Sequence, residues 1–128
     1  MKRKIITLFL SILTVITVAS AFTVTANAAT VTLTADDKWV YSSTLSAKGT
    51  KASVYNAASS KHDVYGIIQY KSGSSYVTDK EFLVAKGKNS GDKNSASYFT
   101  ANKTWRLELN PYGVATKGCT ADGTITSR

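Results

Sequence analysis

The chain contains 128 residues, with 16 lysines and arginines against eight aspartates and glutamates, and its net charge is +8. It has one cysteine and one histidine, which excludes a framework of internal disulfides and a His-rich metal site. This length suits one domain after an export segment, and that domain has to fold by packing alone.

Residues 1–28 have the three parts of a secretory signal peptide. Three basic residues open the segment, a long apolar run follows, and Ala26 and Ala28 are small residues at the positions that signal peptidase reads. We expect cleavage after Ala28, with Ala29 as the second choice. An uncleaved membrane anchor is the alternative, because the apolar run is close to the length that spans a bilayer. Cleavage would leave 13 basic and all eight acidic residues in 29–128, a net charge of +5.

The mature domain alternates between short segments rich in Thr, Val and Tyr and turns rich in Gly, Ser, Asn and Asp. Such segments favour β-strands, and none of them has a sustained helical period. We expect strands at residues 30–34, 38–43, 50–57, 62–71, 76–85, 97–109, 114–119 and 124–127. The segment 86–95 is predicted to be a mobile hairpin loop, and 121–123 is predicted to be a tight turn.

The strand that ends at Leu109 has the clearest pattern. Trp105, Leu107 and Leu109 alternate with polar residues, so we expect them to face the core, with Trp105 at its centre. In the strand at 62–71, the positions predicted to point inward are Val64, Gly66, Ile68 and Tyr70.

Turn signals recur about every ten residues, which is typical of a β-sandwich or a β-barrel. We therefore predict an all-β domain at residues 29–128, a small antiparallel β-sandwich of about seven or eight strands. A small closed β-barrel is the alternative.

Motifs for catalysis and cofactor binding are missing from the sequence. It has no Cys-x-x-Cys pair, no Gly-rich phosphate loop and no Gly-x-Ser-x-Gly elbow, and its acidic residues lack the spacing of a calcium loop. His62 and Cys119 would act as base and nucleophile only if the fold brought them together. We expect Cys119 to be a small buried side chain, with an intermolecular disulfide or a reactive thiol as the alternatives. We predict a protein that is not an enzyme and has neither a metal nor another cofactor.

The aromatic residues are the best indication of a binding surface, because seven tyrosines and two tryptophans exceed what one small core needs. Tyr65 shares the outward side of its strand with Gln69 and Lys71, and Trp39 and Tyr41 flank a turn. Exposed aromatic rings beside amide and charged groups stack on sugar rings or anchor protein contacts. We predict that these five residues bind a ligand. Cross-strand packing of the tyrosines on a two-sided sheet is the alternative.

The basic charge is spread over the whole chain, without an arginine cluster or a recognition helix. We therefore expect no nucleic-acid partner, no stable membrane insertion after signal cleavage, and a monomer. An anionic cell-envelope polymer, a glycan or an extracellular protein is the expected partner.

These observations predict a secreted, non-catalytic binding module. The layout of a signal peptide followed by a short basic β domain resembles small secreted proteins of Gram-positive bacteria, including β-sandwich bacteriocins. That resemblance implies the alternative function, a bacteriocin-like or toxin-like protein that acts on another cell's envelope. A structural or inhibitory domain without a small ligand is the third class.

Overall fold

The computed structural model describes residues 27–112 and 114–128, so the predicted signal peptide lies almost entirely outside the described residues. The described residues form nine β-strands and no helix, and thus no helix that could cross a membrane. The strands are β1 (Ala28–Leu33), β2 (Val40–Tyr41), β3 (Leu45–Ala47), β4 (Thr50–Asn56), β5 (Val64–Ser72), β6 (Ser75–Val84), β7 (Lys93–Asn94), β8 (Lys103–Pro111) and β9 (Ala121–Ser127).

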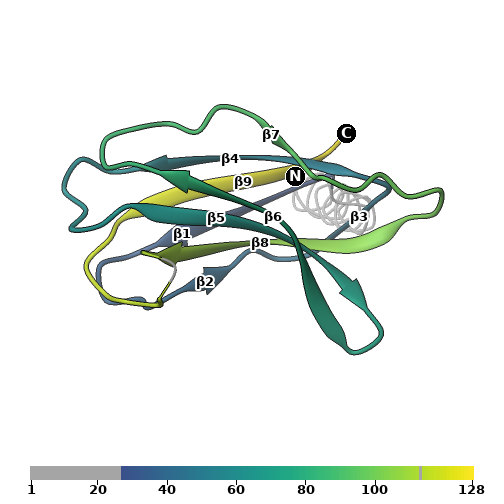
Figure 1. Cartoon of the computed structure of the whole chain (residues 1–128), viewed down its shortest axis with the longest axis horizontal. Helices are drawn as coiled ribbons and strands as arrows, with labels where there is room; N and C mark the ends of the chain where they lie inside the picture. The colour runs from purple at the N-terminus through teal and green to yellow at the C-terminus, as the bar shows by residue number, and fades with distance from the viewer. Residues whose placement is uncertain (1–26, 113) are drawn as a thin grey trace, which may run out of the picture.

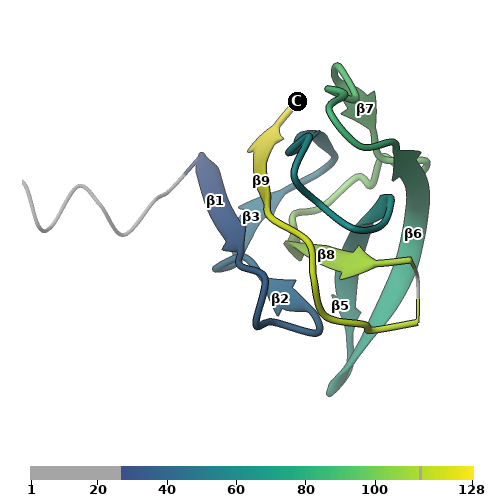
Figure 2. The same ribbon diagram turned by 90° about the vertical axis from the view of Figure 1, so that its left-hand side faces the viewer.

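The strands form two antiparallel sheets, which confirms the predicted all-β sandwich rather than a closed barrel. One sheet has the order β1-β9-β4-β7, and the other has the order β2-β8-β5-β6 with β3 also paired to β8. Figure 1 shows the long strands running along the long axis of the domain. In Figure 2, turned by 90°, β1 and β9 lie towards one side and β5 and β6 towards the other.

The core lies between the two sheets and follows the alternation of β8. Trp105, Leu107 and Leu109 are fully buried, as predicted, and the indole Nε1 of Trp105 donates a hydrogen bond of 2.7 Å to the backbone oxygen of Ala47. That bond gives the one polar group of the ring a partner, which a buried tryptophan requires. Apolar residues of seven strands complete this core: Ala29, Val31, Leu33, Leu45, Ala47, Ala52, Val54, Val64, Ile68, Phe82, Val84, Trp105, Leu107, Leu109, Ala121 and Ile125.

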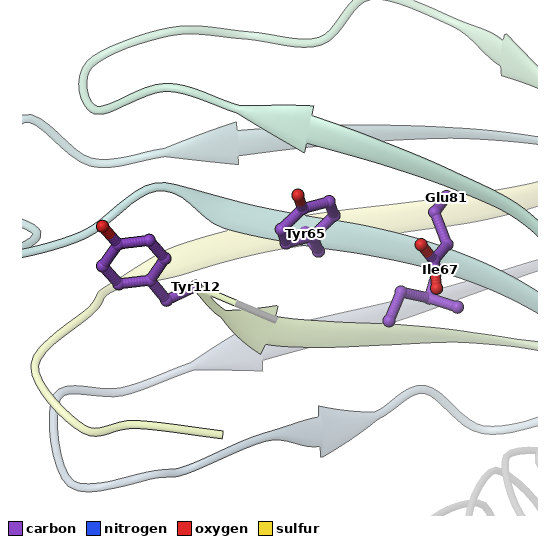
Figure 3. Close-up of a pocket in the computed structure, with 4 residues that line it drawn as sticks. All are labelled: Tyr65, Ile67, Glu81 and Tyr112. Atoms are coloured by element: carbon purple, nitrogen blue, oxygen red, sulfur yellow. The ribbon is translucent and has the colours of Figure 1, made fainter. Parts of the chain in front are cut away.

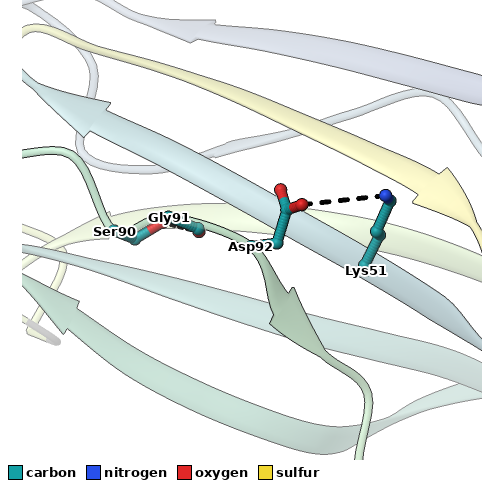
Figure 4. Close-up of polar contacts among 4 residues, drawn as sticks. All are labelled: Lys51, Ser90, Gly91 and Asp92. Carbon is teal, nitrogen blue, oxygen red and sulfur yellow. Dashed lines mark hydrogen bonds and ion pairs between the residues drawn. The ribbon is translucent and has the colours of Figure 1, made fainter.

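The segment 86–95 is not the free hairpin loop that its composition predicts. It runs along the edge of β4, where β7 pairs with residues of β4 and where the hydroxyl of Ser90 accepts a hydrogen bond of 2.9 Å from the amide of Val54. Lys51 and Asp92 form an ion pair of 3.7 Å at the same edge (Figure 4). Serine hydroxyls accept hydrogen bonds from backbone amides of β4 here. The segment can therefore run along β4 without the alternation of apolar and polar residues from which a strand is predicted.

The predictions for the C-terminal part were wrong at two places. Residues 114–119 contain no strand in the part that the structure describes, and 121–123 is not a turn but the start of β9. Gly123 faces the core, where an added Cβ would lie 2.8 Å from Cδ2 of Leu107. The glycine therefore allows close approach of the two sheets. An Asp-Gly pair is also the usual signal of a hairpin turn, so the sequence alone could not separate these two roles.

Candidate functional site

The candidate site lies on the outer face of the β2-β8-β5-β6 sheet, meaning the side chains that point away from the core. In the strand register, Glu108 of β8 lies opposite Tyr41 of β2 on one side and Ile67 of β5 on the other. Ile67 in turn lies opposite Glu81 of β6. Side chains opposite each other on neighbouring strands are in contact range, so these four form a row across the sheet. A second row pairs Arg106 with Gln69, and a third pairs Asn110, Tyr65 and Leu83.

The guanidinium group of Arg106 is held between two tyrosine rings of this face. Its Cζ lies 3.8 Å from the ring centroid of Tyr41 and 3.7 Å from that of Tyr76. Its Nε donates a hydrogen bond of 2.8 Å to Oε1 of Gln69. Both aromatic faces and the amide oxygen favour the cation, so Arg106 has a fixed position.

The amide of Gln69 links this cation to a buried carboxylate. Its Nε2 donates to Oε1 of Glu108 at 3.4 Å, and Nδ2 of Asn110 donates to Oε2 of Glu108 at 2.8 Å. Gln69 and Glu108 are both buried although they point outward from the sheet. A buried charge has to be paired or hydrogen-bonded, and the two amides fulfil that need. This part of the outer face is therefore a closed internal network rather than an open surface.

Beside the network is a hollow of about 260 Å³, lined by Tyr65, Ile67, Glu81 and Tyr112. We call it the tyrosine hollow. Figure 3 shows Tyr65 between Tyr112 on one side and the pair of Ile67 and Glu81 on the other. The hollow thus combines two phenol rings, one aliphatic wall and one carboxylate, a mixture of apolar surface with a few polar groups that is typical of small-ligand sites.

Tyr112 takes its position from an unusual backbone conformation. Its φ is +58°, in the left-handed region that non-glycine residues rarely adopt, and 61% of its surface is exposed. Its amide donates a hydrogen bond of 2.8 Å to the backbone oxygen of Asp63, and its ring centroid lies 5.2 Å from that of His62. Strained conformations persist only where the surrounding structure holds them, and they cluster at active sites and ligand-binding sites.

The structure places four of the five residues predicted from the sequence on the outer face. Tyr65, Gln69 and Tyr41 lie there, but Gln69 is buried within the network and Tyr41 is stacked on Arg106. Lys71 is on the same face, exposed and paired with Tyr76 near the far end of β5. Trp39 precedes β2 and is 46% exposed.

Sequence reasoning did not select several residues that build this face. They are Tyr76, Glu81, Arg106, Glu108, Asn110 and Tyr112. The polar positions of β8 were correctly expected to point outward, which was the available signal for Arg106, Glu108 and Asn110. No local pattern indicates Tyr112, because its position depends on a turn conformation.

Cys119 and His62 are not arranged as a nucleophile and a base. The Cys119 thiol is free and buried, as favoured from the sequence, and donates to the backbone oxygen of His62 at 3.4 Å. The ring of His62 is packed against Tyr112 instead.

No family model and no curated protein matches this sequence. Two solved structures align with this chain. The crystal structure of PirA aligns with a TM-score of 0.50 and 10% sequence identity, covering 80% of this chain and 94% of that one. The crystal structure of the Yersinia pseudotuberculosis-derived mitogen aligns with a TM-score of 0.47 and 15% identity, covering 80% of this chain and 86% of that one. At these identities the similarity to PirA supports the β-sandwich fold of this chain and carries over neither an activity nor a partner.

Proposed function

We propose that this chain is exported by its first 28 residues and acts outside the cell as a non-catalytic module that binds a glycan in the tyrosine hollow. The observation that carries the proposal is the pairing of Tyr65 and Tyr112 with the carboxylate of Glu81 around one hollow. A sugar ring has an apolar face of C–H groups and a rim of hydroxyl groups. Aromatic rings suit the first and a carboxylate, which only accepts hydrogen bonds, suits the second.

The size of the hollow supports a small occupant. Its volume of about 260 Å³ is below the range of pockets that enclose a drug-sized molecule, so one sugar unit of a longer chain is the fitting ligand. The rest of the glycan would lie over the open part of the outer face.

The network beside the hollow supports binding without a large rearrangement. Glu108 and Asn110 are fixed by hydrogen bonds, and the oxygen of the Asn110 side chain accepts a bond of 2.8 Å from the amide of Ala115. Tyr65 lies opposite Asn110 in the β5–β8 register, so the side chain of Asn110 beside it already has a fixed position before a ligand binds. Pre-organised side chains lose less freedom on binding, which favours affinity for a small ligand.

The test is binding of the purified mature domain to a panel of neutral and acidic oligosaccharides, followed by titration calorimetry. Tyr65→Ala should weaken binding by about five- to thirtyfold, because loss of a stacked ring removes about 1–2 kcal/mol. Tyr55→Ala is the control, since it also removes an accessible tyrosine ring from a strand, but from β4 of the other sheet.

Absence of any Tyr65-dependent glycan binding would overturn the proposal. In that event, inhibition of bacterial growth by the domain would favour the bacteriocin-like or toxin-like alternative, and a stable complex with a purified extracellular protein would favour a protein partner.

A further inference from the structure

We infer that the glycan carries an acidic group, and that a second hollow, which shares Tyr112 with the tyrosine hollow, binds it. This inference rests on the proposed function and adds the chemical class of the ligand. The second hollow has a volume of about 240 Å³ and is lined by Lys61, His62, Asp63, Lys86 and Tyr112. We call it the basic hollow.

The charges of the basic hollow favour an anion. Two lysines and one carboxylate line the hollow, and Oδ1 of that carboxylate, Asp63, accepts a hydrogen bond of 3.3 Å from the backbone amide of Lys86. An ammonium group attracts carboxylate and phosphate oxygens and donates up to three hydrogen bonds to them. His62 also lines this hollow, and an imidazole ring has an N–H group that can donate to such oxygens.

The aliphatic part of the Lys61 side chain packs against Gly118. The side chain lies so close to Gly118 that a Cβ added there would come within 2.8 Å of Cδ and 3.2 Å of Cγ of Lys61. The backbone amide of Lys61 also donates a bond of 2.9 Å to the oxygen of Gly118. Packing of the methylene groups on a glycine restricts the direction of the ammonium group, which lowers the entropy lost when it binds an anion.

Tyr112 is a wall of both hollows, so one ligand can occupy them together. Glu81 lines only the tyrosine hollow and would repel an acidic group placed there. The arrangement therefore favours one orientation, in which the sugar ring stacks against Tyr65 with hydroxyl groups towards Glu81, and the acidic substituent extends past Tyr112 towards the lysines.

The shared chemistry of the ligand is a sugar or sugar-like unit with one anionic oxygen group. Two sources provide it, a carboxylate of a uronic-acid glycan or a phosphodiester of a cell-wall polymer. The test uses three probes that separate them: trigalacturonate, its fully methyl-esterified form, and a short poly(glycerol phosphate). The ester has the same sugar rings as the acid without the charge, which makes it the matched neutral probe.

We expect trigalacturonate to bind about fivefold more tightly than its ester, as two partly exposed charge contacts allow. Lys61→Gln combined with Lys86→Gln should abolish this difference and leave binding of the ester unchanged. Lys93→Gln, which removes one positive charge at β7 on the other sheet, should retain the preference for the acid. If the phosphate polymer alone binds through Lys61 and Lys86, the acidic group is a phosphodiester.

Equal binding of the acid and the ester, with no lysine-dependent binding of the phosphate polymer, would overturn this inference. Tyr65→Ala would still weaken binding of neutral glycans in that case, so the proposed function would stand. A loss of acid binding in the Lys93→Gln variant of about half the loss in the variant with both lysines replaced would also contradict it, because the preference would then follow the net charge of the protein and not the position of the lysines.

Discussion

Replacement of Arg106 by methionine tests whether the outer face is held together by its internal network. Methionine keeps a long apolar side chain between Tyr41 and Tyr76 but removes the charge and the hydrogen bond to Gln69. Each cation–π contact of a partly exposed arginine contributes about 0.5–1 kcal/mol, and a hydrogen bond from a charged donor contributes about 1.5–3 kcal/mol. Because these contributions overlap, we expect the free energy of unfolding to fall by about 2–4 kcal/mol.

The loss has a second origin in the buried carboxylate. With Arg106 replaced, Gln69 loses the donor to its oxygen, and Glu108 keeps two amide contacts but has no cation behind them. A buried charge without a compensating partner is costly, so a double variant with Glu108→Gln should recover part of the lost stability.

Urea unfolding followed by tryptophan fluorescence measures the change, with Arg128→Met as the matched control. Arg128 lies over a single ring, that of Tyr98, at 5.2 Å, and its Nη2 donates one hydrogen bond of 3.2 Å to the backbone oxygen of Ser95. Because it has one ring contact fewer than Arg106 and, among the described residues, no buried carboxylate behind it, we expect its replacement to cost about 1–2 kcal/mol. An Arg106→Met variant within about 0.5 kcal/mol of the wild type would refute the reasoning, since that range is typical of surface substitutions with no special contacts.

Two further predictions concern the core and the acid stability of the fold. Trp105→Ala should lower the free energy of unfolding by about 3–5 kcal/mol. Trp105→Phe loses the bond to Ala47 and part of the ring volume, and should lower it by about 1–3 kcal/mol in the same urea assay. Equal losses in the two variants would contradict full burial of the indole. Hydrogen bonds from the backbone amide and, to a smaller extent, the hydroxyl of Thr34 hold the pKa of Asp37 below its ordinary value of 3.8. The ionised carboxylate therefore stabilises the fold above pH 3.8. This contribution is lost as the pH falls through the lower pKa of the folded state. The stability difference between wild type and Asp37→Asn should therefore be largest near neutral pH and should disappear as the pH falls below 3.8. A difference that is independent of pH would show that the ionised carboxylate of Asp37 is not its cause.

The alternation of apolar and polar residues was sufficient to predict the fold class and most of the core. It placed Trp105 and Leu107 inward because a strand has two sides and only one of them was apolar. The same rule failed at Gly123, where the absence of a side chain serves sheet packing, and at β7, where serine hydroxyls replace a hydrophobic pattern.

The candidate site was less accessible to sequence reasoning, because its residues meet only through strand register. Arg106 lies between tyrosines of β2 and β6, strands that are far from β8 in the sequence. The alternation rule predicts that Arg106 points outward, but not which strands flank it. Gln69 was expected to contact a ligand, yet the same register places it between Arg106 and Glu108 and buries it.

The final prediction separates a functional from a structural role of Tyr112. A left-handed backbone costs a bulky residue about 1 kcal/mol or more, whereas asparagine tolerates it better. The ring contact with His62 offsets part of this cost, so we expect Tyr112→Asn to change the free energy of unfolding by less than about 1 kcal/mol.

Binding should respond differently from stability, because Tyr112 lines both the tyrosine hollow and the basic hollow. Tyr112→Asn should weaken binding of the acidic trisaccharide at least tenfold, while Tyr112→Phe, which keeps the ring, should bind within about threefold of the wild type. Thermal unfolding and calorimetry on the same three proteins provide both measurements. A Tyr112→Asn variant that loses more than about 2 kcal/mol of stability would show that the strained turn serves the fold. A variant that binds like the wild type would show that Tyr112 does not contact the ligand.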